Sequence, residues 1–135
     1  GIESTIVALR DDGWEVLRPG PVTADQIAAV LGNARASAGT GRIEAPGQLA
    51  SHYSPGKPVR LNVQAAEPDE FVIGFGAIAG DVSLSPTGDM AEAASRLYDS
   101  LHAAQQAPQP RIAIAPVPDE GIGTAINDRL RRAAA

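Results

Sequence analysis

The chain has 135 residues, 44% of them hydrophobic and 20% charged, and its formal net charge is −5 at pH 7. This composition is ordinary for a globular protein, and the acidic balance argues against a broad electrostatic surface for nucleic acid or anionic lipid. The lack of cysteine excludes a disulfide framework and a thiolate metal site, and no apolar run approaches the about 20 residues of a membrane span. We therefore expect a cytoplasmic protein that does not enter a membrane.

The first 32 residues predict a β-hairpin followed by a short helix. Residues 4–9 (STIVAL) alternate and are rich in β-branched side chains, an Asp-Gly turn follows, and residues 14–20 (WEVLRPG) return as a second strand. In the next segment Thr23 is expected to be the N-cap of a helix, Gln26 completes a capping box, and Gly32 ends the helix. The face expected to be buried consists of Ile27, Val30 and Leu31.

Residues 33–57 differ in character from the segments on either side. They are rich in Gly, Ala, Ser and Pro and show no usable periodicity, which is typical of a linker or a functional loop. The stretch APGQLASHYSPGKPV, residues 45–59, also places a histidine and a tyrosine between rigid turns. Residue 1 is Gly and a strand pattern begins almost at once, so we expect the chain to be part of a longer one.

The second half of the chain predicts alternating strands and helices. Strands are expected at residues 58–63, 70–76 and 111–117, with a shorter one at 81–85. Strands that alternate with helices imply right-handed crossovers and a mostly parallel sheet. The predicted fold class is therefore α/β, a small Rossmann-like domain.

Two helices are expected in this half. The first follows Asp89 as its N-cap, with Glu92 in the capping-box position, and the prolines at 108 and 110 end it. Its inward stripe is expected to consist of Met90, Ala94, Leu97, Leu101 and Ala104. The second helix closes the chain, and its buried face is expected at Ile122, Ile126 and Leu130. A solvated face of this helix is expected at Asp128, Arg129 and Arg131.

Two glycine-rich segments invite a nucleotide-binding interpretation. In GFGAIAG, residues 74–80, the third glycine comes four residues after the second and a strand follows, so a turn between strands is favoured over a dinucleotide site. DEGIGTAINDRL, residues 119–130, could hold an anion at a helix N-terminus. It lacks the lysine of a P-loop, however, and Asp119 and Glu120 would repel phosphate, so these acids are interpreted as complements of the helix dipole.

Single residues leave alternatives open. Arg18, in LRPG at residues 17–20, is either an ordinary solvated strand-end arginine or a phosphate clamp whose fork binds an anion bidentately. Ser4 and Thr5 are either strand fillers or hydroxyl donors that face a pocket. The two histidines lie far apart in the sequence, so no metal site is predicted, and His102 is expected at the surface.

Taken together, four pieces of the chain resemble one family. ESTIV, LRPG, APG followed by HYSP, and the C-terminal GIGTAINDRLRRAA are similar, in order and spacing, to the tail of the two-domain L-threonylcarbamoyladenylate synthases, the long form of the YrdC-like enzymes. The resemblance implies three parts. Residues 1–32 would be the end of a YrdC-like catalytic domain, residues 33–57 a linker that closes its active site, and residues 58–135 a C-terminal Rossmann-like accessory domain.

In this family a nucleotidyltransferase condenses L-threonine, bicarbonate and ATP to threonylcarbamoyl-AMP and pyrophosphate, and the product passes to the machinery that makes threonylcarbamoyl-adenosine in tRNA. The resemblance implies that Ser4 contacts threonine and that Arg18 contacts the ATP phosphates or the adenylate. It further implies an ATP contact from Tyr53 or Ser54, and a closing segment, with His52, that excludes water from a hydrolysable intermediate. ATP is thus expected as a substrate with Mg²⁺, whose ligands would lie outside this chain.

Two departures from the family pattern bear on activity. An acidic residue usually follows STIV, whereas this chain has Ala8, and the family's Lys-x-Arg pair and Ser-x-Asn motif, which belong upstream, are not in it. ATP chemistry needs positioned cations and donors around the phosphates, so the chain alone is expected to be inactive. The alternatives are a regulatory module that senses a nucleotide or docks a partner, and a domain that only braces the linker. Direct tRNA binding by so acidic a chain is not expected.

Overall fold

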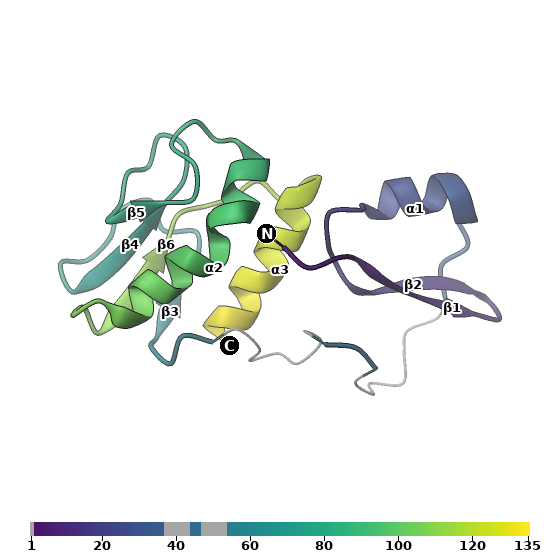
Figure 1. Ribbon diagram of the computed structural model, residues 1–135, viewed down its shortest axis with the longest axis horizontal. Coiled ribbons are helices and arrows are strands. Elements are labelled where there is room, and N and C mark those ends of the chain that lie inside the picture. Colours follow the sequence, from purple (N-terminus) through teal and green to yellow (C-terminus); the bar gives the residue numbers. More distant parts are fainter. Residues whose placement is uncertain (1, 37–43, 47–53) are drawn as a thin grey trace.

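The computed structural model describes residues 2–36, 44–46 and 54–135, which form two lobes (Figure 1). The hairpin and the first helix form one lobe, and a parallel sheet with two longer helices forms the other. The N-terminal residues run over the second lobe before they enter the hairpin, and Ile2 packs against the core of that lobe. Among the described residues, no helix has the length and apolar character that crossing a membrane requires.

The predicted hairpin is confirmed. β1 (Ile6–Arg10) and β2 (Gly13–Arg18) pair in antiparallel fashion around the expected turn. β1 begins two residues later than predicted, so Ser4 and Thr5 lie in the segment that leads into the hairpin rather than in the strand itself. Their side chains are therefore placed by tertiary contacts and not by the strand pleat.

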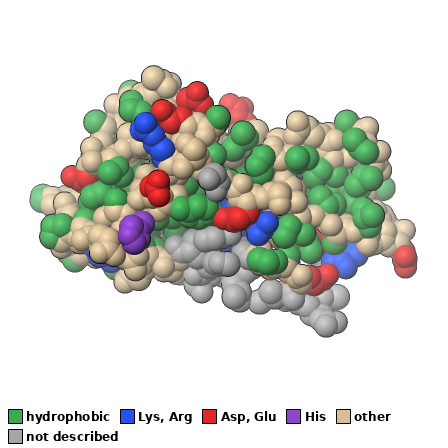
Figure 2. All heavy atoms as spheres, in the orientation of Figure 1, with side chains coloured by type: hydrophobic (Ala, Val, Ile, Leu, Met, Phe, Trp, Pro, Cys, Tyr) green, Lys and Arg blue, Asp and Glu red, His purple; other side chains and the backbone are tan. Residues whose placement is uncertain are grey.

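The short helix is confirmed, but most of its predicted buried face is not. α1 (Ala24–Leu31) follows Thr23, whose hydroxyl accepts from the Gln26 amide while the Gln26 side chain accepts from the Thr23 amide. Ile27 is buried as expected. The other two members of the predicted face are exposed, Val30 by 83% and Leu31 by 45%, because no segment in the described part of the chain covers them. Hydrophobic side chains gather on the surface of this lobe (Figure 2).

Trp14 attaches the start of the predicted linker to the hairpin. Its side chain is buried, and the indole nitrogen donates to the Gly32 carbonyl at 2.8 Å. The backbone of Trp14 also donates to the Ala34 carbonyl at 3.1 Å and accepts from the Ala36 amide at 2.9 Å. The Arg35 guanidinium lies 4.1 Å from the centre of the Trp14 ring, a cation–π contact. The chain is thus fixed for several residues beyond α1.

The second lobe is built on four parallel strands in the order β3-β6-β4-β5. The strands are β3 (Val59–Arg60), β4 (Glu70–Gly74), β5 (Val82–Ser83) and β6 (Arg111–Ile114). This arrangement confirms the predicted α/β, Rossmann-like class. Each strand is shorter than its predicted range, but backbone hydrogen bonds continue beyond the strand ends, since the Val63 amide donates to the Ile114 carbonyl at 2.9 Å.

The GFGAIAG segment is the turn that the sequence favours. Residues 75–81 alone join the parallel strands β4 and β5, so no helix begins here to meet a pyrophosphate. A Cβ on Gly74 would overlap the Ile78 carbonyl, and one on Gly80 would overlap the Val72 carbonyl. The glycines therefore allow the turn to lie directly against its own strand.

Two helices cover one face of the sheet. α2 (Met90–Gln106) and α3 (Ile122–Ala134) contact each other (Figure 1). Asp89 caps α2 as predicted, since its carboxylate accepts from two amides of the first turn. The predicted capping box is wrong, because the Glu92 side chain pairs with Arg96 at 3.4 Å instead.

The core lies between the sheet and these two helices, and most of the predicted apolar faces enter it. Met90 and Ala94 of the predicted α2 stripe, and Ile122 of α3, are only partly buried against it. The buried members of the core are Phe71, Ile73, Leu84, Ala93, Leu97, Leu101, Ala104, Ile112, Ile114, Val117, Ile126, Leu130 and Ala133.

Lys57 ties the end of the predicted linker to the end of α2. Its ammonium donates to the carbonyls of Ala104, Ala107 and Gln109 at 2.9, 2.7 and 2.8 Å. A cation at this place satisfies carbonyls that the helix C-terminus leaves without a partner and complements the helix dipole. The linker therefore enters the sheet at a fixed point.

Glu70 carries a buried charge at the start of β4, on the face of the sheet opposite the core. Its carboxylate accepts from Nε and Nη2 of Arg60 at 2.8 and 2.6 Å and from the Glu67 amide at 2.8 Å. Hydrogen bonding to the Arg60 guanidinium is the main reason why the pKa of Glu70 is lowered from 4.5 to about 2.

We predict that the protein loses stability as the pH falls from 4.5 towards 2, in part because Glu70 becomes protonated. Since folding lowers this pKa, the contribution of Glu70 is complete above the unfolded value and is lost as the pH falls through the folded value. Glu70→Gln should lower the free energy of unfolding at neutral pH by roughly 1–3 kcal/mol and flatten its pH dependence in this interval. Urea titrations measure both effects. Glu67→Gln, the same charge change at an exposed site, is the control, and an equal effect of the two variants would contradict the assignment.

Candidate functional site

Arg18, the last residue of β2, joins segments that are far apart in the sequence. It is only 8% exposed, so the interpretation as an ordinary solvated arginine is wrong. Nε and Nη2 donate to the Ser4 carbonyl at 3.1 and 3.0 Å, and Nη1 donates to the Pro46 carbonyl at 3.4 Å. ESTIV, LRPG and APG, which the sequence analysis treats as separate motifs, thus meet at one guanidinium. In this structure the Arg18 guanidinium donates to backbone carbonyls, and its contact with ATP stays a prediction.

The segment before β1 is held against the Pro-Gly turn that follows β2. The Thr5 hydroxyl donates to the Val22 carbonyl at 2.7 Å and accepts from the Val22 amide at 3.1 Å, so it binds backbone rather than facing a pocket. A Cβ on Gly20 would overlap the backbone of Ser4 and Thr5, so only glycine permits this approach. Ser4 is exposed, and its predicted contact with threonine stays a prediction.

Arg129 of α3 reaches the same region from the second lobe. Its side chain is fully buried. Nη1 donates to the Pro19 carbonyl, and Nη2 donates to the Glu3 carbonyl at 3.2 Å and lies 3.3 Å from the Glu3 carboxylate. The Glu3 carboxylate also accepts from the hydroxyl of Tyr98 in α2. Both helices of the second lobe therefore hold the residue next to Ser4.

The sequence analysis missed the role of Arg129. It placed Asp128, Arg129 and Arg131 on a solvated face, but Asp128 and Arg129 are buried and only Arg131 is exposed. A signal was present, since Arg129 lies three residues after Ile126 and so beside the buried stripe of the helix. The spacing does not show the acceptors, which lie 110 and 126 positions away along the chain.

The contacts of the two arginines define one region, which we name the junction. The junction consists of Glu3, Ser4, Arg18, Pro19, Gly20, Pro46 and Arg129. Four of the motifs that carry the family resemblance contribute to it.

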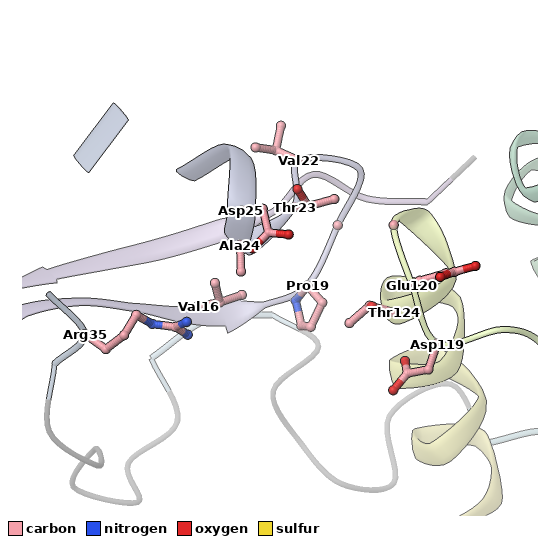
Figure 3. A pocket seen from close by; sticks show the side chains of 12 residues that line it. Val16, Pro19, Val22, Thr23, Ala24, Asp25, Arg35, Asp119, Glu120 and Thr124 are labelled. Carbon is pink, nitrogen blue, oxygen red and sulfur yellow. The ribbon is translucent and has the colours of Figure 1, made fainter. Parts of the chain in front are cut away.

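A pocket of about 450 Å³ lies beside the junction, between the hairpin lobe and the start of α3 (Figure 3). Among the described residues, Asp25 lines it from the first lobe and Asp119 and Glu120 line it from the segment before α3, against one cation, Arg35. The negative balance disfavours a phosphate group in this pocket. The lining residues are Val16, Pro19, Gly20, Val22, Thr23, Ala24, Asp25, Arg35, Asp119, Glu120, Gly121 and Thr124.

Of the remaining predicted site residues, the structure describes only Ser54, because His52 and Tyr53 lie outside the described residues. Ser54 lines a different pocket, of about 210 Å³, beside Tyr98 and His102 of α2, and its hydroxyl accepts from the Gly56 amide at 3.4 Å. His102 is exposed as predicted. Within the described part of the chain, no group of three or more His, Cys, Asp or Glu side chains could hold a metal ion.

We predict that Gly20→Ala separates the Ser4–Thr5 segment from the Pro-Gly turn. The added Cβ would overlap backbone atoms, which cannot rotate away as a side chain does, so the free energy of unfolding should fall by roughly 1–3 kcal/mol. Amide hydrogen exchange at Val22, whose N–H donates to Thr5, should become faster. Gly32→Ala is the comparison for backbone strain without a clash, because Gly32 has a φ of +85° but a Cβ there meets no atom within 4 Å. It should lower the free energy of unfolding without a selective acceleration of exchange at Val22. Unchanged exchange at Val22 in Gly20→Ala would contradict the prediction.

Comparisons with known proteins indicate one family. Residues 22–135 match the family described as "Threonylcarbamoyl-AMP synthase, C-terminal domain". The chain is 29% identical to the threonylcarbamoyl-AMP synthase of Bacillus subtilis (strain 168), in a match that covers 99% of this chain and 45% of that protein. The chain thus spans less than half the length of this curated relative. No solved structure matches it. Because the family match begins at Val22, just after the Pro-Gly turn, and runs through α1 and the parallel sheet to residue 135, the chain belongs to the family of threonylcarbamoyl-AMP synthase C-terminal domains.

Proposed function

We propose that the chain is the C-terminal part of an enzyme that condenses L-threonine, bicarbonate and ATP to threonylcarbamoyl-AMP and pyrophosphate. The family supports this proposal, and one structural observation carries it furthest. Three motifs of the resemblance converge on Arg18, whose donors reach Ser4 and Pro46. Motifs that meet in space although they are separated in sequence are expected of a substrate site rather than of three independent turns.

The reaction joins two steps. Bicarbonate and the threonine amine first give a carboxylated threonine and water, and a carboxylate oxygen of this intermediate then attacks the α-phosphorus of ATP, which expels pyrophosphate. In this scheme the exposed Ser4 hydroxyl contacts threonine, and Arg18 contacts the phosphates or the adenylate. The carboxylated amine returns readily to threonine and bicarbonate in water, so the site must close before the second step.

We assign the closing of the active site to the linker. We place the end of the catalytic domain at residues 1–32, the linker at 33–57 and the accessory domain at 58–135. The linker is attached at both ends, by Trp14 at its beginning and by Lys57 at its end. Between these ends, Pro46 reaches the junction, where its carbonyl accepts from Arg18 at 3.4 Å. His52 is proposed to close the site. Tyr53 or Ser54 is proposed to contact the nucleotide.

The chain by itself should not catalyse the reaction. Transfer to the α-phosphate of ATP requires several positioned cations around the phosphates. In the junction we propose Arg18 alone for this role, and the described lining of the adjacent pocket carries a negative net charge. We propose that Mg²⁺ arrives with ATP and that its protein ligands lie outside this chain. The product would pass to the tRNA-modifying machinery, and the net charge of −5 argues against direct tRNA binding by this part.

The alternative function is a regulatory module that senses a nucleotide without catalysis. The pocket of about 450 Å³ beside the junction offers a concavity for such a ligand. Among its described lining residues, the carboxylates Asp25, Asp119 and Glu120 outnumber the Arg35 guanidinium, which disfavours the phosphate group of a nucleotide. Titration of the chain with ATP should therefore release no measurable heat, and binding in the micromolar range would favour the regulatory function instead.

We predict that the complete protein releases pyrophosphate from ATP only when threonine and bicarbonate are both present. Arg18→Ala should lower the rate by roughly 100-fold, because it removes a cation from the phosphates and frees the Ser4 carbonyl. Arg18→Lys keeps the charge but loses the fork, so it should recover part of the affinity for ATP.

The control is Arg96→Ala, which removes a half-exposed arginine from α2. Arg96→Ala should leave the rate of pyrophosphate release unchanged. The 135-residue chain alone should release no pyrophosphate. The proposal would be abandoned if the complete protein released no pyrophosphate in a threonine-dependent manner. The role of Arg18 alone would be abandoned if both Arg18 variants behaved like Arg96→Ala.

A further inference from the structure

Arg129 holds the neighbours of both residues proposed to bind substrates. Its Nη1 donates to the carbonyl of Pro19, which follows Arg18, and its Nη2 donates to the carbonyl of Glu3, which precedes Ser4. Arg129 itself touches neither proposed substrate contact, and it is fully buried, so it cannot reach a substrate. It belongs to α3, in the lobe that the proposed function treats as accessory.

Packing alone does not account for an arginine at this position. The Nε of Arg129 is buried and donates to no acceptor among the described residues, and burial of a guanidinium carries a large desolvation penalty. A methionine is shorter but would fill much of the space without that penalty. What methionine cannot do is donate to two carbonyls at once, in the fixed geometry of a planar fork.

The second lobe grips the N-terminal segment at more than one point. The Glu3 carboxylate lies 3.3 Å from Nη2 of Arg129 and also accepts from the Tyr98 hydroxyl of α2. Ile2 packs against the core of the same lobe. Residues 2 and 3 are therefore seated on the second lobe, and Ser4 is the next residue along the chain.

We propose that Arg129 is a positioning residue that sets the distance and orientation between the Glu3–Ser4 and Arg18–Pro19 segments. Through it the accessory lobe determines the affinity of the site for threonine and ATP without contacting either. This inference rests on the proposed function for its catalytic consequence, but its structural part can be tested independently.

The structural test uses the 135-residue chain and amide hydrogen exchange. Arg129→Met should accelerate exchange by about tenfold at Val22, which depends on the Thr5 contact, and at the β1–β2 pairs next to Arg18. Exchange at Ile112, which pairs within the parallel sheet, should not change. Arg131→Met, which removes the same charge from the exposed side of α3, is the matched control. Equal acceleration at Ile112 and Val22 would mean general destabilisation and would overturn the proposal.

The catalytic test uses the complete protein and separates KM from kcat. Arg129→Met should raise the KM for threonine and ATP by about tenfold with a smaller change in kcat, since misplacement of binding groups weakens both ground-state contacts. Arg129→Lys, which can reach one carbonyl but not both, should fall between Arg129→Met and the unchanged protein. A lower kcat with unchanged KM would indicate only a smaller folded fraction and would overturn the proposal.

A second variant keeps the test informative if Arg129→Met does not fold. Glu3→Gln retains both backbone acceptors of Arg129 and removes the carboxylate. It should therefore raise the KM for threonine and ATP by a smaller factor than Arg129→Met does. An unchanged KM would count against the proposal. If the unchanged complete protein shows no threonine-dependent release, the proposed function fails. The positioning role is then decided by hydrogen exchange alone.

Discussion

A buried guanidinium limits how the two lobes of this protein can be arranged. Arginine offers five N–H donors and no acceptor, so its burial requires carbonyls or carboxylates at fixed places. Arg129 finds them in Glu3 and Pro19, which flank the hairpin, and so joins the end of the chain to its beginning. Arg129 thus contributes both to the entry of the N-terminal segment and to the position of the Pro-Gly turn, together with Tyr98, which binds the Glu3 carboxylate, and Ile2, which packs on the core of the second lobe.

Arg18 performs the corresponding task on the other side of the same turn. It binds the Ser4 and Pro46 carbonyls, so it joins the segment before β1 to the linker, whereas Arg129 joins that segment to α3. Gly20 allows the two backbones to approach closely enough for both arginines to reach them. A residue with a side chain at position 20 would push the segments apart and weaken both sets of hydrogen bonds together.

This arrangement bears on what a C-terminal domain contributes to the family. The chain spans less than half of its curated relative, and its own pocket is negative, so it supplies few of the charges that phosphate chemistry needs. In the function that we propose, its contribution is geometric. The two ends of the linker are attached to different lobes by Trp14 and Lys57, and the segment that carries Ser4 is held from both helices. We propose that the lobe acts on the site through the backbone that it positions.

Local chemistry allowed much of the fold to be predicted. The capping box at Thr23, the N-cap at Asp89 and the glycine turn after β4 are set by neighbours within a few residues, and the alternation of strands and helices by itself determined a parallel α/β sheet. Only the tertiary structure decided that Val30 is exposed, that Arg129 is buried and that Arg18 binds backbone. Periodicity shows which side of a helix differs from the others, but it contains no information about which distant segment covers that side. The acceptors of both arginines are backbone carbonyls, which are present at every position and therefore leave no signature in the sequence.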